Sequence, residues 1–535
     1  MHGQRVAYYV CGENILPESP VVPGSTAPER VPPIRFGRLF GRTQKAPPPE
    51  ERDRVVQKLV RLGRLMNERS DGKKKGNSDI PAGYTYLGQF IAHEVTHDST
   101  GNLLAAELKL ENLSTPEVDL DSLYGGEDGP KKRPELYLSD GIRLRTNDTP
   151  YNPEYTPVFP NDLPRGTQRS PDDKTKGNPN EPLLGDPRNA ENLPLAQTHV
   201  AFIHFHNRVV EELVKEGRPA DKLFELARAV VIRHYQWLIL YDFLPRLVRA
   251  DVLDCVRSHG LRWFKGDGGD GLFMPLEFSA AAFRIGHTMV RAAYEWNPLR
   301  RTGSGKPPDL KTLFKQTGRI EGGHKRLSAD WVIDWRHFYD FEPLNRYRPV
   351  AQHNVSAKLD TVFNMHLDDV TGAPDEKIEQ MQKAITVRNL LRGFYLGLPT
   401  GEEAAEWMGE KPLTRKQLAD GLHEGLLDDP AFWGKTPLWY YVLKEAELLG
   451  FNKEGVPGNR LGPVGSRIVA ETLVGLIKNS PISVIKDKDE DEDWRPTFGR
   501  PADGETGPLK FEMIDLLHFA GVVSPVAEVQ KELFV

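Results

Sequence analysis

The sequence predicts a mainly α-helical fold with little β structure, built as one large domain. Apolar residues recur at helical spacing in most long segments, and few stretches alternate with a period of two. The chain also carries 48 glycines and 43 prolines among 535 residues, so many connections are turns or irregular loops. This composition argues against a coiled coil and against a helix bundle with short loops.

Composition excludes several classes of protein. Hydrophobic residues make up 39% of the chain and charged residues 27%, with a net charge of −6. This is the balance of a soluble globular protein, and the slight acidity argues against a nucleic-acid binder. No run of 18 apolar residues predicts a transmembrane segment. The N-terminus shows no secretory signal, so we expect a cytoplasmic protein or one exported without a cleavable signal.

Histidine greatly outnumbers cysteine. Two cysteines against 15 histidines cannot supply a disulfide framework or a zinc–thiolate site. If the chain binds a metal, histidine and carboxylate side chains must supply most of the ligands.

Residues 1–50 are rich in proline and glycine and predict an N-terminal arm, whose segment IRFGRLF anchors it to a body formed by residues 51–535. The first helix of the body is predicted from Val55, Leu59, Leu62 and Met66, which share one face. Further elements follow as an amphipathic segment at 82–98 and as helices near 193–216, 221–243, 277–296, 374–395, 400–407, 414–422, 436–448 and 464–478. Residues 115–180 predict a long irregular region, and the acidic run 486–493 a solvated loop.

Two motifs overlap in the amphipathic segment. Residues 93–97 read HEVTH, an H-E-x-x-H pattern that on a helix would place His93 and His97 toward one zinc ion, with Glu94 as general base. The longer zinc-protease pattern fails, because Thr100 and Leu103 stand where glycine and histidine are required.

The second motif is GQFIAHE at residues 88–94, in which Gln89 and His93 share a helix face. It resembles the distal helix of the animal-type haem peroxidases, of the peroxidase–cyclooxygenase superfamily. The resemblance implies that Gln89 and His93 face the open side of the haem iron, with His93 as the catalytic acid and base.

Three further blocks follow in the family's order. GDPRNAE at 185–191, with HNR at 206–208, resembles the segment that carries the distal arginine, here Arg188. The same match assigns Glu191 to the carboxylate that forms an ester with a haem methyl group. From the residues alone, Arg188 could equally form a loop salt bridge.

AAFRIGHT at 281–288 resembles the proximal segment and assigns His287 as the axial iron ligand, with Arg284 against the haem or its propionate. Small residues there would let a flat macrocycle approach. RNLLR at 388–392, followed by GLP, resembles the block in which Asn389 accepts the Nδ1 proton of His287 and Arg392 pairs with a propionate. A helix cap and a surface ion pair are the alternatives for these two residues.

TPEVDLD at 115–121, followed by Tyr124 and Gly125, resembles the family's calcium loop. Oxygen donors alternating on a short segment suit a hard cation. The resemblance implies side-chain ligands from Thr115, Asp119, Asp121 and Glu94, and a backbone carbonyl from Glu117. A solvated acidic turn is the alternative.

The resemblance spans residues 35–525, and the chain's ending and missing signal are similar to bacterial members. Three positions depart from the mammalian pattern: Ala92 and Asn192 replace residues that make further haem bonds, and Glu94 replaces an aspartate. At most one ester, through Glu191, is therefore expected. The haem should be less distorted, which argues against strong oxidation of halides, especially chloride.

The resemblance thus implies a haem peroxidase that uses hydrogen peroxide to oxidise a halide, thiocyanate or a small phenolic donor through a ferryl intermediate. A fatty-acid dioxygenase of the same superfamily is the nearest rival, although cyclooxygenases carry a tyrosine where this chain has Arg284. A zinc peptidase, or a non-catalytic relative that keeps the fold, would also be consistent with the sequence.

Overall fold

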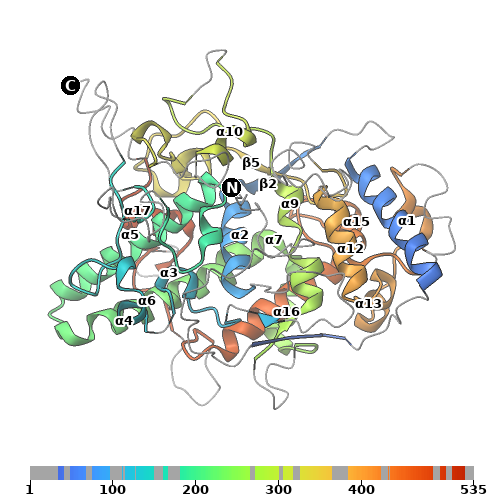
Figure 1. Cartoon of the computed structure of the whole chain (residues 1–535), viewed down its shortest axis with the longest axis horizontal. Coiled ribbons are helices and arrows are strands. Elements are labelled where there is room, and N and C mark those ends of the chain that lie inside the picture. Colours follow the sequence, from blue (N-terminus) through green and yellow to red (C-terminus); the bar gives the residue numbers. More distant parts are fainter. Residues whose placement is uncertain are drawn as a thin grey trace, which may run out of the picture.

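Helices dominate the computed structural model, as the sequence predicts (Figure 1). The structure describes the following residues: 34–40, 49–67, 75–96, 111–112, 115–126, 128–149, 161–166, 181–264, 272–300, 305–316, 326–363, 384–422, 432, 434–485, 494–501 and 509–524. Most of their buried apolar side chains belong to one continuous core.

Helix α2 (Gly83–Val95) lies near the middle of the molecule (Figure 1). It packs on α5 (Leu193–Lys215), which in turn packs on α6 (Leu223–Leu238). The Phe90 ring of α2 stacks on Phe202 of α5, with centroids 4.9 Å apart and planes nearly parallel. Leu87, Phe90 and Ile91 are fully buried. Their burial orients α2, so that the opposite face turns away from α5.

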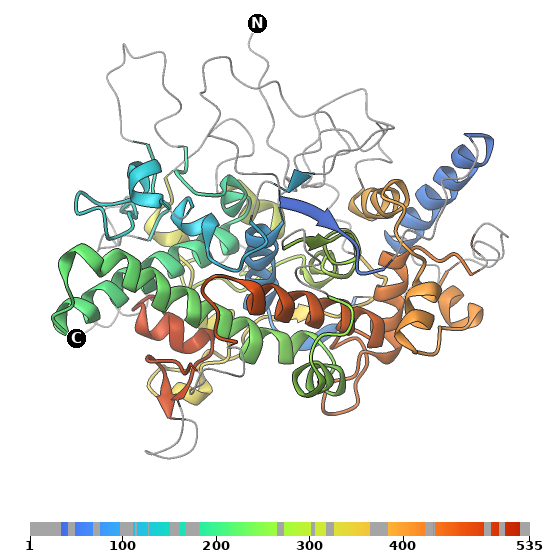
Figure 2. The same cartoon turned by 90° about the horizontal axis from the view of Figure 1, so that it is seen from below.

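The other side of α2 adjoins the short helix α9 (Gly286–Met289). Beyond it, α1 (Pro49–Asn67) packs on α12 (Ile385–Tyr395), and α13 (Gly401–Met408), α14 (Arg415–Ala419) and α15 (Leu438–Leu449) complete this half. Helix α16 (Pro463–Asn479) crosses the lower face in contact with α8 (Ala250–His259) and α15 (Figure 2). Segments distant in sequence thus meet around α2.

The described strands are short, and the pair β2–β5 lies beside α2. β1 (Ile34–Gly37) pairs antiparallel with β3 (Glu111–Asn112) and parallel with β4 (Met274–Pro275). β2 (Asn77–Pro81) pairs antiparallel with β5 (Val355–Ala357), and β6 (Arg500–Pro501) with β7 (Leu509–Lys510).

Most helices expected from periodicity are confirmed, but two expectations are wrong. The segment near 277–296 is not one helix: the π-helical turn η5 (Phe278–Ala282) and a bend at 283–285 precede α9, and the backbone is extended at Val290. The helix expected to end near Pro245 continues through the π-helical turn η4 (Ile239–Phe243) into α7 (Leu244–Leu247). Pro245 is the second residue of α7.

Three helices were not expected: α8, α10 (Leu310–Lys315) and α17 (Met513–Phe519). Residues 374–383 of one expected helix and the acidic run at 486–493 lie outside the described residues. In the 115–180 region, the described parts contain two four-residue helices, α3 (Asp121–Tyr124) and α4 (Gly129–Lys132), and otherwise turns and short bridges.

Residues 1–33 of the predicted arm lie outside the described residues. The IRFGRLF segment forms β1 and then contacts the body: the backbone N–H groups of Leu39 and Phe40 donate to Glu277. Arg38 donates to the carbonyls of Leu396 and Gly397. The boundary at residue 50 stays a prediction, and helix α1 begins at Pro49.

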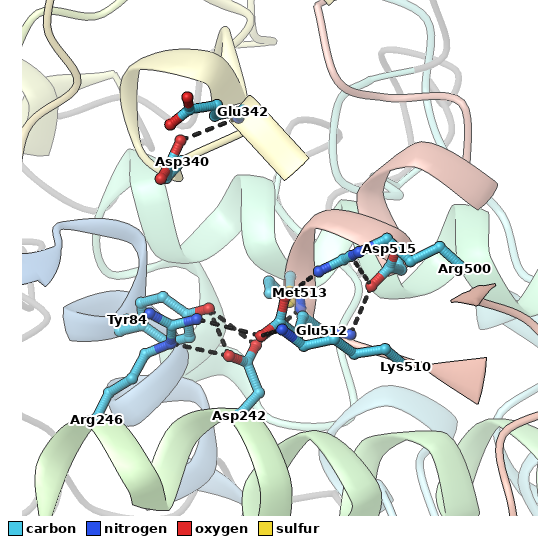
Figure 3. Close-up of polar contacts among 10 residues, drawn as sticks. All are labelled: Tyr84, Asp242, Arg246, Asp340, Glu342, Arg500, Lys510, Glu512, Met513 and Asp515. Atoms are coloured by element: carbon cyan, nitrogen blue, oxygen red, sulfur yellow. Dashed lines mark hydrogen bonds and ion pairs between the residues drawn. The ribbon is translucent and has the colours of Figure 1, made fainter. Parts of the chain in front are cut away.

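A buried carboxylate holds the start of α2 (Figure 3). The hydroxyl of Tyr84 lies 2.7 and 2.9 Å from the two oxygens of Asp242, which is 1% exposed on η4. Asp242 also accepts from Arg246 Nε at 2.9 Å and from the backbone N–H of Met513 at 2.8 Å. One side chain therefore joins α2, η4 and α17.

Charged groups extend this contact toward the C-terminal segment. Glu512 lies at the start of α17 and pairs with Arg246 at 3.5 Å, Lys510 at 3.1 Å and Arg500 (Figure 3). Burial raises the pKa of Asp242, and Arg246 opposes that rise. The carboxylate is thus compensated by the Arg246 guanidinium and by two further donors, the Tyr84 hydroxyl and the Met513 backbone N–H.

We predict that Tyr84→Phe lowers the free energy of unfolding by about 1.5–3 kcal/mol, the cost of losing a hydrogen bond to a charged group. Urea unfolding measures the loss. Tyr241→Phe is the matched control, because Tyr241 lies on the same π-helical turn as Asp242 and is 48% exposed. Equal effects of the two substitutions would contradict the role given to the Tyr84–Asp242 contact.

Candidate functional site

The central helix α2 presents Gln89 and His93 one turn apart. The helix begins at Gly83, where an added Cβ would lie 2.2 Å from the Tyr339 ring, so the close approach requires glycine. Its apolar side faces the core around α5. Gln89 is half-buried and His93 is 7% exposed.

Residues 186–192 supply the contacts to His93. Its Nδ1 lies 3.0 Å from Oδ1 of Asn189, and its Nε2 lies 3.8 Å from Oε2 of Glu191. Its backbone carbonyl accepts from Arg188 Nη2 at 2.7 Å. Three residues of one turn therefore contact one residue of α2.

Arg188 is buried and forms the loop salt bridge that the sequence left open. Its Nε lies 3.0 Å from both oxygens of Asp186, and its Nη2 lies 2.5 Å from Oδ2. Asp186 also accepts from the Arg188 backbone N–H, which caps the turn η2 (Pro187–Ala190). The salt bridge and the contact with His93 coexist, so the pair positions Arg188 beside α2.

Gln89 lies between two residues of the same segment. Its Nε2 donates to Glu191 Oε2 at 3.3 Å, and its Oε1 accepts from Asn192 Nδ2 at 2.9 Å. Asn192 Oδ1 in turn accepts from the backbone N–H of Leu195 and caps α5. The expected distal residues Gln89, His93, Arg188 and Glu191 are thus brought together.

On the opposite side of this group, α9 carries His287. Residues 281–288 do not form one helix, so Arg284 lies in the turn before α9 and does not share a helix face with His287. The Arg284 Nε donates back to the Ser279 carbonyl at 2.8 Å, and its own carbonyl accepts from Trp439 Nε1 at 3.3 Å. Arg284 is half-buried beside α9.

Asn389 of α12 adjoins His287. Its amide nitrogen lies 3.5 Å from His287 Nδ1, while its buried Oδ1 has no hydrogen-bond partner. Exchanging the amide oxygen and nitrogen would let Oδ1 accept the Nδ1 proton, and such exchanges are a matter of assignment. Arg392 follows on the same helix and is 5% exposed. At Gly286, an added Cβ would meet no atom within 4 Å, so there is open space beside His287.

The expected calcium ligands also lie close together. Glu94 accepts from the backbone N–H groups of Asp121 at 2.7 Å and Ser122 at 3.1 Å. Thr115 Oγ1 lies 3.0 Å from Asp121 Oδ2 and 3.4 Å from Asp119 Oδ1. Glu94 therefore caps the start of α3 and ties the loop to the end of α2.

The loop has excess negative charge. Burial and the charge of Asp121 raise the pKa of Glu94 to about 7. Burial, Asp121 and Glu94 raise the pKa of Asp119, and Arg228, 2.9 Å from it, opposes that rise. Within the described residues, however, no group of three or more His, Cys, Asp or Glu side chains is arranged to hold a metal ion. His97 of the zinc motif lies outside them.

Sequence reasoning missed Asp186 and Asn189 and gave His199 no specific contact. Asn189 Nδ2 lies 3.2 Å from His199 Nδ1, and both residues are buried. The available signal was the run of polar residues within 186–192, immediately before an apolar helix, since buried polar side chains need partners.

A family model matches the part of the chain that carries these residues. The family model described as animal haem peroxidase matches residues 89–333, which include the segments carrying Gln89, His93, Arg188 and His287. Residues 89–333 of this chain, a little under half of it, are thus similar to the animal haem peroxidase family. This is a family of oxidoreductases.

Two relatives illustrate the likeness within the family. Thyroid peroxidase of Sus scrofa is 27% identical over 396 residues, which are 70% of this chain and 39% of that protein. The peroxidase-like protein of Margaritifera margaritifera is 26% identical over 252 residues, 39% of this chain and 32% of that protein. The chain therefore spans well under half the length of these relatives.

Solved structures share the fold. Peroxidase A from Dictyostelium discoideum superposes with a TM-score of 0.53 at 14% identity, covering 90% of this chain and 89% of that one. Fatty acid alpha-dioxygenase from Arabidopsis thaliana superposes with a TM-score of 0.50 at 13% identity, covering 90% and 76%. Among the described residues, no helix is long and apolar enough to cross a membrane.

We predict that Asp186→Asn lowers the free energy of unfolding by about 3–5 kcal/mol, because it leaves the buried Arg188 guanidinium without its counter-charge. Chemical denaturation measures this loss. Glu211→Gln is the control: it breaks the Arg208–Glu211 pair, whose side chains are 45% and 47% exposed, and should cost about 0.2–1 kcal/mol. Similar losses in both variants would show that the buried pair has no special role.

Proposed function

We propose that this protein is a haem peroxidase that uses hydrogen peroxide to oxidise a halide, thiocyanate or a small phenolic donor. The observation that carries the proposal is the convergence of Gln89, His93, Arg188 and Glu191 on one side of α2, which adjoins the helix bearing His287. These residues fall in the order of the family motifs, within the segment that matches the family model.

The residues around His287 fit a haem group. Open space at Gly286 leaves room beside the proposed axial ligand. The orphaned Oδ1 of Asn389 would accept the Nδ1 proton of His287, which leaves Nε2 as the iron ligand. Arg284 and Arg392 would pair with the propionates. Glu191, 2% exposed, is the one residue proposed to form an ester with a haem methyl group.

The residues on the α2 side of the site, across from His287, each have a proposed role. His93 accepts a proton from one peroxide oxygen and returns it to the departing oxygen. Arg188 stabilises the negative charge that develops as the O–O bond breaks, and Gln89 orients the peroxide. The chemistry that bound haem supplies is the reduction of peroxide at iron, followed by oxidation of the donor.

Calcium is proposed as a second cofactor. The support is the gathering of the side chains of Glu94, Thr115, Asp119 and Asp121, with a Glu117 carbonyl in the same loop. Oxygen donors of this kind suit calcium. Because Glu94 and Asp119 are engaged with backbone N–H groups and Arg228, binding requires these side chains to turn toward the ion.

A fatty-acid dioxygenase remains the alternative within the superfamily, since such an enzyme shares the fold. A tyrosine three residues before the axial histidine would favour it, and this chain has Arg284 there. Oxygen uptake with linoleate or palmitate and no added peroxide would favour the dioxygenase over the peroxidase. Stoichiometric zinc without bound haem would instead favour the peptidase.

We predict that His93→Ala slows the reaction with peroxide by about 10²–10⁴-fold, the usual contribution of a general acid and base, while haem stays bound. Stopped-flow absorbance at the Soret band measures the second-order rate constant. His259→Ala, at an exposed position in α8, is the control. An unchanged rate in His93→Ala would contradict the assignment of His93.

We also predict that a chelator removes one calcium ion per chain and lowers the melting temperature, since a ligand at 100 times its Kd stabilises the folded state by about 2.7 kcal/mol. Elemental analysis and thermal unfolding measure the two effects. Asp121→Asn should abolish the response to chelator, whereas Asp128→Asn, which is solvent-exposed, should keep it. Protein purified without chelator that contains no calcium would overturn the calcium proposal.

A further inference from the structure

A side-chain amide lies between two histidine rings beside the proposed active site. Asn189 Oδ1 is 3.0 Å from His93 Nδ1, and Asn189 Nδ2 is 3.2 Å from His199 Nδ1. Their side chains are well removed from solvent: Asn189 is 0% exposed, His199 1% and His93 7%. The three residues come from η2, α5 and α2, so the contact joins three elements.

With the Asn189 amide oriented as it is in the structure, the direction of each hydrogen bond follows from the chemistry of the groups. An amide oxygen only accepts, so His93 must carry a proton on Nδ1 to donate to Asn189. An amide nitrogen only donates, so His199 must present a lone pair on Nδ1. Burial lowers the pKa of His199 to about 3, which keeps this ring neutral and able to accept.

A neutral imidazole carries one proton, so a proton on Nδ1 leaves Nε2 of His93 with its lone pair. We propose that Asn189 and His199 are positioning residues that hold His93 in this tautomer. The inference rests on the proposed peroxidase function, in which Nε2 accepts the peroxide proton. The inference adds that two buried side chains, Asn189 and His199, act at Nδ1 of His93 and thereby determine that Nε2 is the acceptor atom.

A residue next to Nε2 of His93 favours the other tautomer, so the tautomer has to be fixed by a further contact. Oε2 of Glu191 lies 3.8 Å from Nε2, and an oxygen acceptor there favours a proton on Nε2 before any ester forms. With a proton on Nε2, neutral His93 could not accept one from peroxide. The Asn189 bond opposes that tautomer, and a net hydrogen-bond contribution of about 1 kcal/mol shifts the ratio between tautomers roughly fivefold.

Asn189 is itself held in place. Its backbone N–H donates to the Asp186 carbonyl at 3.1 Å within the turn that also holds Arg188. The His199 ring lies edge-on to Phe90 of α2, with centroids 6.0 Å apart. Turning the amide over would give His93 a donor at Nδ1 and require a proton on His199 Nδ1, which would reverse the tautomer.

The test compares two substitutions of His199 in the haem-bound protein. His199→Phe keeps a buried ring but removes the acceptor for Asn189 Nδ2, whereas His199→Gln keeps an acceptor oxygen. Asn189→Leu removes the relay itself at similar volume, and His259→Gln is an exposed control. The rate of reaction with peroxide is measured by stopped flow.

A second readout does not depend on turnover. A hydrogen bond donated to carbon monoxide bound at the ferrous haem lowers its C–O stretching frequency, so infrared spectra report whether Nε2 of His93 carries a proton. A purely structural role for Asn189 and His199 would not move this band in protein that retains its full haem content.

We expect His199→Phe and Asn189→Leu to lower the peroxide rate constant about fivefold or more and to add a C–O band at lower frequency. His199→Gln should restore both readouts, and His259→Gln should leave both unchanged. Unchanged rates and bands in both disruptive variants, or a wild-type band that already reports a proton on Nε2, would overturn this inference.

Failure of the proposed function can be distinguished from failure of the relay. If the wild-type protein binds no haem or does not react with peroxide, the proposed function fails and this inference fails with it. If the wild-type protein reacts and His93→Ala does not, while Asn189→Leu reacts at the wild-type rate, only the relay is disproved.

Discussion

The central helix α2 is fixed at both ends by hydrogen bonds that involve buried carboxylates. Near its start, Tyr84 donates to Asp242, which also binds Arg246 and the first residue of α17. Near its end, Glu94 accepts two backbone N–H groups at the start of α3. An unpaired carboxylate would be costly at these buried positions, so the partners specify where α2 lies.

The proposed site depends on that placement. Between the two fixed ends, α2 offers Gln89 and His93 to one turn of chain, residues 186–192, which contacts both. The turn is held by the buried pair of Asp186 and Arg188 and continues directly into α5. The side that carries His287 is built differently, from a π-helical turn, a bend and a four-residue helix. The α2 side of the site is therefore held by side-chain hydrogen bonds to one turn. The His287 side packs on α12 and α15 and is held by separate contacts, such as the hydrogen bond from Thr288 Oγ1 to the Asp360 carbonyl at 2.9 Å.

The sequence predicted the fold class and most helices because apolar periodicity reports which face of a helix is buried. It failed at residues 277–296 because a helix-like composition does not distinguish a continuous α-helix from a π-helical turn followed by a bend. Motif resemblance identified Gln89, His93, Arg188 and Glu191, which the structure brings together. It could not identify Asp242 or His199, because their partners Tyr84 and Asn189 lie far away in sequence and only folding makes them neighbours.

The central claim is that this chain holds haem through His287, and one measurement tests it directly. Absorption spectra of the purified protein are compared with those of His287→Gly, with and without added imidazole. The account predicts a Soret band with one haem per chain in the wild-type protein, loss or alteration of that band in the variant, and its recovery when imidazole replaces the missing ligand. A wild-type protein without a Soret band, or a His287→Gly spectrum identical to that of the wild type, would contradict it.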